Sequence, residues 1–167
     1  RRQAGDQTQI ADGPVTTGEP CMEPLPHHYP VTATVSADSN VRLTTPGAAA
    51  IKSAGPLQFG GPGDLWSPEA LLSAAVADCF VLSFRAIARK ARFDWLSLDC
   101  DVNGTLDKVD GLTRFTEFAV RATLTVPTGS RREKAEKLLA TAEKTCLITN
   151  SLNAESHLAM EIIEKSS

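Results

Sequence analysis

The sequence predicts an α+β domain, and three observations carry this prediction. Several short segments alternate apolar and polar residues, one long apolar helix lies in the middle of the chain, and a second helix precedes a last alternating segment. The chain has 167 residues, which suits one domain of ordinary size. Apolar residues make up 42% and charged residues 22%, so the composition excludes a disordered, collagen-like or coiled-coil chain.

The charge and hydropathy patterns exclude two classes of partner. The net charge is −3 and no long basic run occurs, so we expect no nucleic-acid binding. The most apolar run, residues 70–84, carries Asp78 and is shorter than the roughly 18 to 20 residues that span a bilayer. The first residues lack the apolar core of a signal peptide. We therefore expect a cytoplasmic protein with no membrane partner.

The first part of the chain predicts an arm followed by strands. Residues 1–28 are rich in Gly, Pro, Thr and Gln and show no period, which predicts a flexible N-terminal arm, with the domain spanning 29–167. Residues 29–45 alternate as strands with a turn at 38–40, and the Gly/Pro cluster at 60–64 predicts a loop.

A long helix is predicted from Ser67 to about residue 92. Ser67 is a suitable N-cap, Pro68 suits the first helical position, and Glu69 complements the positive end of the helix dipole. The helix is apolar on nearly every side until Arg85. We therefore expect it to be covered by sheets or by another subunit.

The remaining chain predicts two strands, a helix and a last strand. The strands cover 98–106 and 118–126 with a turn in 107–112, and Leu158, Met160 and Ile162 alternate as the last strand. Ser130 and Glu133 form a capping-box pattern that is expected to open the second helix. The predicted buried face of that helix comprises Ala135, Leu138, Leu139, Ala142 and, at its end, Cys146.

The four cysteines differ in their predicted surroundings. Cys79 lies in the apolar helix, and Cys146 ends the second helix. Each of the two can be interpreted as a small core residue or as a reactive thiol. Cys100 and Cys21 are expected to be unreactive residues without a role in a site. Cys79 lies about 18 Å beyond the helix start, too far for the dipole to stabilise a thiolate. A reactive Cys79 therefore needs a cation from another segment. Cys146 lies at the negative end of its helix, which also disfavours a thiolate, so it suits a second, resolving thiol better than a first attacker.

Glu69 adds a constraint on assembly. It precedes Cys79 by about 15 Å of helical rise and faces another direction, so the two side chains cannot touch within one helix. They meet only if a second copy of the helix packs against the first. A functional Glu69 thus implies a dimer with shared sites, and the alternative is an acid that only complements the helix dipole.

Metal and cofactor motifs are absent from the sequence. It has no CxxC, HExxH, GxGxxG or P-loop pattern. Cys21 with His27 and His28 is the only close group of metal-ligand residue types, and the two histidines are expected to be ordinary surface residues. His157 is expected to be structural. We therefore predict no metal and no cofactor.

Three motifs resemble those of the OsmC/Ohr family of thiol-dependent peroxidases. Residues 67–72 (SPEALL) followed by 77–80 (ADCF) are similar to its central helix. Residues 106–111 (LDKVDG) before a strand resemble the OsmC branch, and 142–146 (AEKTC) followed by Ser151-Leu152 resembles the second-cysteine segment. The match covers about residues 31–163 in the family's order and spacing.

The resemblance implies a fold and a chemistry. The expected fold is an intertwined homodimer whose two long central helices per subunit are enclosed by curved antiparallel sheets, with active sites at the subunit interface. The expected activity is reduction of organic hydroperoxides without metal or flavin. Cys79 would be the attacking thiolate, and its sulfenic acid would condense with Cys146 to a disulfide that an external dithiol reduces.

The resemblance also implies an active-site arginine held by Glu69. In the family this arginine comes from the N-terminal strands, where this chain offers Arg42. Apolar side chains around Cys79, including Leu72 and Phe80, favour an apolar substrate over hydrogen peroxide. Two alternatives remain: a non-catalytic dimer that binds a small apolar ligand at the interface, and a thiol redox sensor with a protein partner.

Overall fold

The structure of this chain, a computed structural model, describes residues 23–166. It divides into two units, one ending at Pro30 and the other starting at Val31. Cys21 and most of the predicted arm lie outside the described residues, so the boundary between arm and domain at 28/29 stays a prediction.

A small antiparallel sheet opens the second unit. Its strands are β1 (Thr32–Thr34), β2 (Val41–Thr44) and β3 (Ile51–Ser53), in the order β1-β2-β3. β1 and β2 and the turn between them were predicted from the alternation of residues 29–45. β3 was missed because it follows Gly47 and three alanines, where no alternation of apolar and polar residues marks a strand. All three β1 residues are exposed, and so is Ile51.

Helix α1 (Pro68–Lys90) forms as the sequence predicts. The Ser67 hydroxyl oxygen accepts a hydrogen bond from the Ala70 amide at 3.2 Å and caps the first turn. One stripe of the helix, Val76, Phe80, Phe84 and Ala88, is buried in the core.

The remainder of α1 is less covered. Leu82 keeps 49% of its surface exposed. α1 extends beyond the apolar run 70–84 at both ends, and by length and composition alone it could cross a membrane, a test that the core helices of other proteins pass as well. Within one chain, the apolar helix is thus covered only in part.

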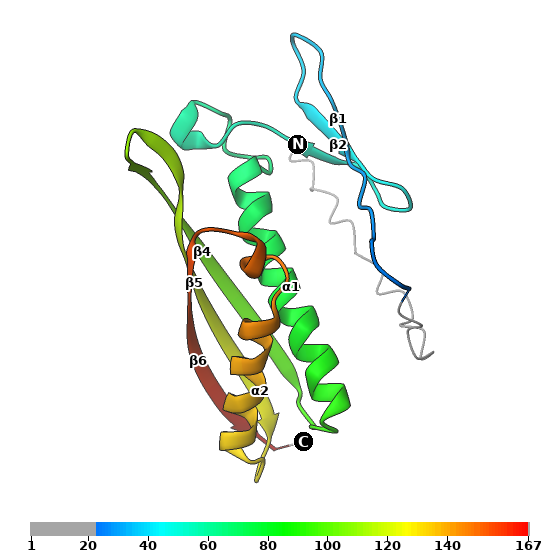
Figure 1. Cartoon of the computed structure of the whole chain (residues 1–167), viewed down its shortest axis with the longest axis vertical. Coiled ribbons are helices and arrows are strands. Elements are labelled where there is room, and N and C mark those ends of the chain that lie inside the picture. The colour runs from blue at the N-terminus through cyan, green and yellow to red at the C-terminus, as the bar shows by residue number, and fades with distance from the viewer. Residues whose placement is uncertain (1–22, 167) are drawn as a thin grey trace, which may run out of the picture. The chain divides into compact units, whose positions relative to one another are not determined.

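A larger sheet supports α1. It contains β4 (Ser97–Val109), β5 (Leu112–Pro127) and β6 (Glu155–Lys165), with β4 antiparallel and β6 parallel to β5. Asp110 and Gly111 take positive φ angles of 51° and 81° and make the tight turn between β4 and β5. Figure 1 shows α1 and α2 side by side on one face of this sheet. The predicted inward face of β5 is buried: Phe118, Val120, Ala122, Leu124 and Val126.

Helix α2 (Arg132–Thr145) starts differently from the prediction. The expected capping box of Ser130 and Glu133 does not form: the N-cap is Arg131, and it makes no side-chain cap. The Ser130 hydroxyl instead donates to the Pro127 carbonyl at 2.6 Å, within a turn that the positive φ of Gly129 closes. The predicted buried face is confirmed: Ala135, Leu138, Leu139, Ala142 and Cys146.

Two sheets and two helices confirm the predicted α+β class. The helix layer lies between solvent and the inner face of β4-β5-β6, and its side chains form one core with that face. This layer carries both Cys79 and Cys146. The expected dimer is not part of the structure and stays a prediction.

Candidate functional site

The structure brings the thiols of Cys79 and Cys146 together. Cys79 lies in the middle of α1, and Cys146 is the residue that ends α2. The side-by-side packing of the two helices makes the thiols neighbours that interact directly. Both are free thiols. Two sulfurs in this arrangement can exchange a proton, and on oxidation they can form a disulfide.

The turn that follows α2 surrounds both sulfurs with hydrogen-bond donors. After α2 the chain forms a short 3-10 helix, Thr149–Ser151. The Asn150 amide donates a hydrogen bond to the Cys146 carbonyl at 3.1 Å and fixes the turn between the two helices. The backbone amides of Leu147 and Ile148 point toward the Cys79 sulfur. Successive amides of this kind favour negative charge on the atoms they face.

Despite these donors, the pKa of the Cys79 thiol is raised. Burial is the largest cause, and the neighbouring Cys146 thiol adds to it, while the Ile148 and Leu147 amides act in the opposite direction. The raised pKa agrees with the expectation that a reactive Cys79 needs a cation, and the source of that cation stays a prediction.

The pKa of Cys146, in contrast, is lowered. Burial acts to raise it, but the hydroxyl and amide of Thr149, the Cys79 thiol and the Ile148 amide together outweigh burial. The prediction that the negative helix end disfavours a thiolate at Cys146 was wrong. It considered the carbonyls of α2 and overlooked the amides of the turn that follows.

Accessibility separates the roles of the two thiols. Cys146 is 1% exposed, whereas Cys79 is only partly buried. Cys79 is therefore the more accessible of the two residues. In the single chain, the thiol with the lowered pKa is the less accessible one.

A third thiol lies in the same core. Cys100 is on the inner face of β4, packed against the residues of the central core. Burial raises its pKa to about 11, with smaller contributions from Asp101 and Cys146. At neutral pH Cys100 is a protonated, inert thiol.

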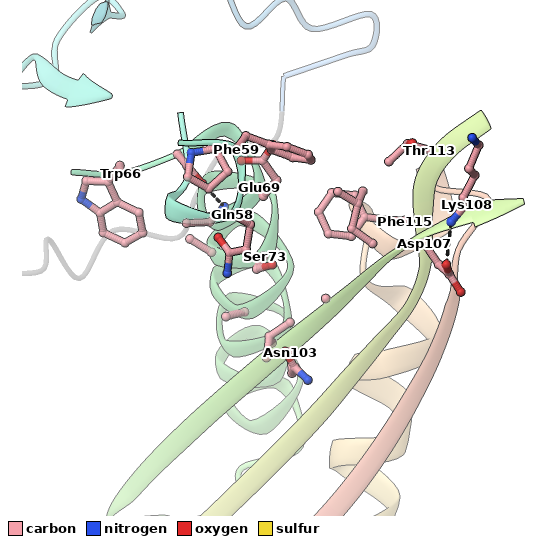
Figure 2. A pocket seen from close by; sticks show the side chains of 18 residues that line it. Gln58, Phe59, Trp66, Glu69, Ser73, Asn103, Asp107, Lys108, Thr113 and Phe115 are labelled. Carbon is pink, nitrogen blue, oxygen red and sulfur yellow. Dashed lines mark hydrogen bonds between the residues drawn. The ribbon is translucent and has the colours of Figure 1, made fainter. Parts of the chain in front are cut away.

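Glu69 lines a groove at the other end of α1. The groove, of about 890 Å³, runs between the start of α1 and the β4–β5 hairpin, as Figure 2 shows. Phe59 and Trp66 line the groove on the side of α1, and Phe115 lines it from the hairpin. One Glu69 carboxylate oxygen, Oε2, is buried and has no hydrogen-bond partner among the described residues. This oxygen is an acceptor in need of a donor.

Arg42 lies on β2, and its side chain is exposed. It lines a hollow of about 360 Å³ on the small sheet. Within residues 23–166, no interaction joins Cys79 to Glu69 or to Arg42. Of the four residues expected at the site, the single chain unites Cys79 and Cys146; the roles of Glu69 and Arg42 stay predictions.

The described residues hold no cluster that suits a metal ion. No group of three or more His, Cys, Asp or Glu side chains gathers anywhere in residues 23–166. His27 Nε2 lies 2.9 Å from the Glu23 carbonyl, and His157 lies 3.4 Å from the Glu155 carboxylate in an exposed pair.

Sequence reasoning missed two parts of the site. Apart from the Thr149 hydroxyl, the donors of the 147–149 turn are backbone amides, which no residue type signals. The groove residues Phe59 and Trp66 flank the segment 60–64, which was interpreted only as a loop. Two aromatic residues beside a Gly/Pro cluster, just before an apolar helix, were the signal available for them.

Comparison with known proteins identifies the family. The family model described as OsmC-like protein matches residues 61–161. Peroxiredoxin OsmC of Escherichia coli K12 is 30% identical over 89 residues, 53% of this chain and 62% of that protein. The aligned part thus spans less than two thirds of that relative. The uncharacterized protein YmaD of Bacillus subtilis is 22% identical over 109 residues, 64% of this chain and 73% of YmaD.

Solved structures share the fold. An OsmC-like protein of unknown function from Vibrio cholerae matches with a TM-score of 0.73 at 23% identity, covering 82% of this chain and 99% of that one. An organic hydroperoxide resistance protein from Elizabethkingia anophelis matches with a TM-score of 0.68 at 19% identity, covering 86% and 100%. The fold of the chain is that of OsmC-like proteins. The chain belongs to the OsmC-like protein family.

Proposed function

We propose that the protein is a cysteine-based peroxidase that reduces organic hydroperoxides. The observation that carries this proposal is the contact between Cys79 and Cys146, two thiols delivered by different helices. The 30% identity to Peroxiredoxin OsmC supports it, and so does the name of the Elizabethkingia protein of the same fold.

The proposed cycle has three steps. The Cys79 thiolate attacks the terminal peroxide oxygen, the O–O bond breaks, and the leaving alkoxide takes a proton to become the alcohol. The Cys146 sulfur then attacks the Cys79 sulfenic acid, forming the disulfide and releasing water. Finally an external dithiol reduces the disulfide by exchange and is itself oxidised to a disulfide. These steps need no metal and no flavin.

Charge placement supports a dimeric enzyme. In one chain the accessible Cys79 has a raised pKa, so its attack requires a nearby cation. Glu69, with its unpartnered buried oxygen, is an anchor for such a cation but lies about 15 Å along α1 from Cys79. A homodimer in which Glu69 and Arg42 approach the Cys79 of the other subunit satisfies both groups. Leu82, which is 49% exposed, provides some apolar area for that contact beside Arg85 and Arg89.

Apolar surroundings favour an organic substrate. Leu72 lies two helical turns before Cys79 on the same side of α1, and it is partly buried against the core. Phe80 was expected beside the substrate as well, but it belongs to the buried core stripe of α1, at 2% exposure. The proposed apolar wall therefore rests on Leu72 and on whatever the second subunit adds.

Intact mass tests the cycle directly. The reduced protein receives one equivalent of cumene hydroperoxide and is then mapped by peptide mass spectrometry. We expect a loss of two hydrogen atoms and a linked Cys79–Cys146 peptide. The Cys146→Ser variant should stop at the sulfenic acid, and Cys79→Ser should not react. An unchanged mass in the wild-type protein, or turnover retained by Cys79→Ser, contradicts the proposal.

The groove at Glu69 favours one second candidate. Its volume of about 890 Å³ and its aromatic walls suit a small apolar ligand, as a non-catalytic binding protein would require. Under this alternative, Cys79→Ser binds an apolar fluorescent probe as wild type does, and neither protein consumes hydroperoxide.

A further inference from the structure

The small sheet presents two cations side by side. In the register of β2 and β3, Arg42 pairs directly with Lys52. Residues paired across antiparallel strands point to the same face of the sheet, so the two cationic side chains are neighbours. Both line the hollow of about 360 Å³, and no acidic side chain lines it with them.

The pairing of two cations destabilises the small sheet, and no acidic side chain among the described residues compensates for it. Like charges directly opposite each other destabilise a sheet. Neither Arg42 nor Lys52 makes an ion pair with any residue between 23 and 166. An anion supplied from elsewhere would turn this repulsion into attraction.

Two groups elsewhere in the chain lack a positively charged partner of the kind that Arg42 and Lys52 provide. The Glu69 carboxylate has a buried oxygen without a donor, and the Cys79 thiol is accessible but lacks a cation to ionise it. Both belong to α1, and within residues 23–166 neither of them makes an ion pair with a cationic side chain. A pair of cations and a pair of acids are thus left unmatched in one molecule.

We propose that Lys52 is a second cation of the thiol site, delivered together with Arg42 to Cys79 and Glu69 in the assembled dimer. The inference rests on the proposed function, because it gives Lys52 a role in the same site. Because the strand register holds Lys52 next to Arg42, an approach of the small sheet that brings one cation to the site brings the other near it. Arg42 suits the planar carboxylate of Glu69, and Lys52 supplies a compact charge for the sulfur.

The opposing interpretation is a solvated face of a sheet. The other face of the small sheet carries Ala33, Leu43 and Ile51, so Arg42 and Lys52 could simply be its polar side. That interpretation predicts that removing either charge leaves the reactivity of Cys79 unchanged. The two interpretations therefore differ in one measurable quantity, the ionisation of a specific thiol.

The test is the pH midpoint of Cys79 alkylation in variants of the full chain. Iodoacetamide labelling is followed by peptide mass from pH 5 to 10, alongside the rate of cumene hydroperoxide reduction. Lys52→Gln is expected to move the midpoint up by about one unit and to slow the peroxide reaction about ten-fold near neutral pH. Lys52→Arg should restore both, and Arg42→Gln with Lys52→Gln should shift the midpoint further than either change alone.

Lys137→Gln provides the matched control, because it removes the same charge from an exposed position on α2. If Lys52→Gln labels with the same midpoint as this control while Cys79→Ser is inactive, the inference is wrong and the peroxidase proposal stands. If Cys79→Ser still reduces hydroperoxide, the peroxidase proposal itself fails. A shifted midpoint without any peroxide reduction supports the cation at Cys79 and rejects the peroxidase.

Discussion

At the scale of single residues, the distribution of one proton decides what the thiol pair can do. The turn amides and Thr149 favour the charge on Cys146, whereas burial keeps Cys79 protonated. Cys79 is the more accessible of the two residues, so a peroxidase must move the charge from the inner sulfur to the outer one. A cation close to Cys79 has this effect, because it stabilises the thiolate at short range in a medium of low dielectric constant.

Cys100 allows a prediction on pH and stability. Its pKa is raised to about 11 in the folded chain, mainly by burial, whereas the unfolded chain titrates it near 9.0. Above that value the unfolded state binds fewer protons than the folded state, so the contribution of Cys100 to stability is complete below about pH 9 and falls as the pH rises toward 11. Urea unfolding under reducing conditions at pH 7, 9 and 10.5 should show a smaller loss of stability in Cys100→Ala than in wild type. Parallel losses in both proteins would contradict the raised pKa.

At the scale of elements, the sequence predicts what periodicity and capping determine. The apolar run after Ser67-Pro68-Glu69 becomes α1, because the Ser67 cap and the buried Val76–Ala88 stripe are both local signals. The Ser130 cap was wrong because α2 starts one residue later than predicted, with Arg131 at the N-cap, and Ser130 belongs to the preceding turn, where its hydroxyl donates to the Pro127 carbonyl at 2.6 Å. The contact between Cys79 and Cys146 depends on how α1 packs against α2, and no local sequence pattern predicts that packing.

Gly104 tests how closely α1 approaches the sheet. A Cβ at this β4 position would lie 2.9 Å from ring atoms of both Phe115 and Phe118 and 3.0 Å from the Ser73 hydroxyl on α1. The two rings stack at 5.1 Å, and Phe118 is 1% exposed, so neither ring can give way easily. Gly104→Ala should therefore lower the free energy of unfolding by about 1 to 3 kcal/mol in urea denaturation.

Gly55→Ala is the control for that measurement. A Cβ at Gly55 meets no atom within 4 Å, and the residue has no positive φ. Its change in unfolding free energy should stay within about 0.5 kcal/mol. If the two alanine variants are equally stable, the close contact of Gly104 with Phe115, Phe118 and Ser73 is not what sets the spacing of β4 and α1.

At the scale of the whole molecule, the unmatched groups of one chain point to a second copy. Leu82 exposes 49% of its surface on a helix whose opposite stripe is fully buried. The acid Glu69 and the thiol Cys79 lie on one helix and cannot meet. A two-fold dimer places each residue of one subunit against a different residue of the other, and each site then appears twice.

This shared-site geometry predicts complementation between two inactive variants. Glu69→Gln and Cys79→Ser should each lose most peroxide reduction, the first because the cation is no longer anchored and the second because the nucleophile is gone. In a mixed dimer, the Cys79 of the Glu69→Gln subunit faces the intact Glu69 of its Cys79→Ser partner, so one of the two sites is complete.

With random mixing, about half the dimers are mixed and about a quarter of the wild-type sites return. Co-expression with two affinity tags isolates the mixed dimer, and its hydroperoxide turnover should approach half that of wild type. If Glu69 acts on the Cys79 of its own chain, no site in the mixed dimer is complete, and turnover stays at the level of the two parents.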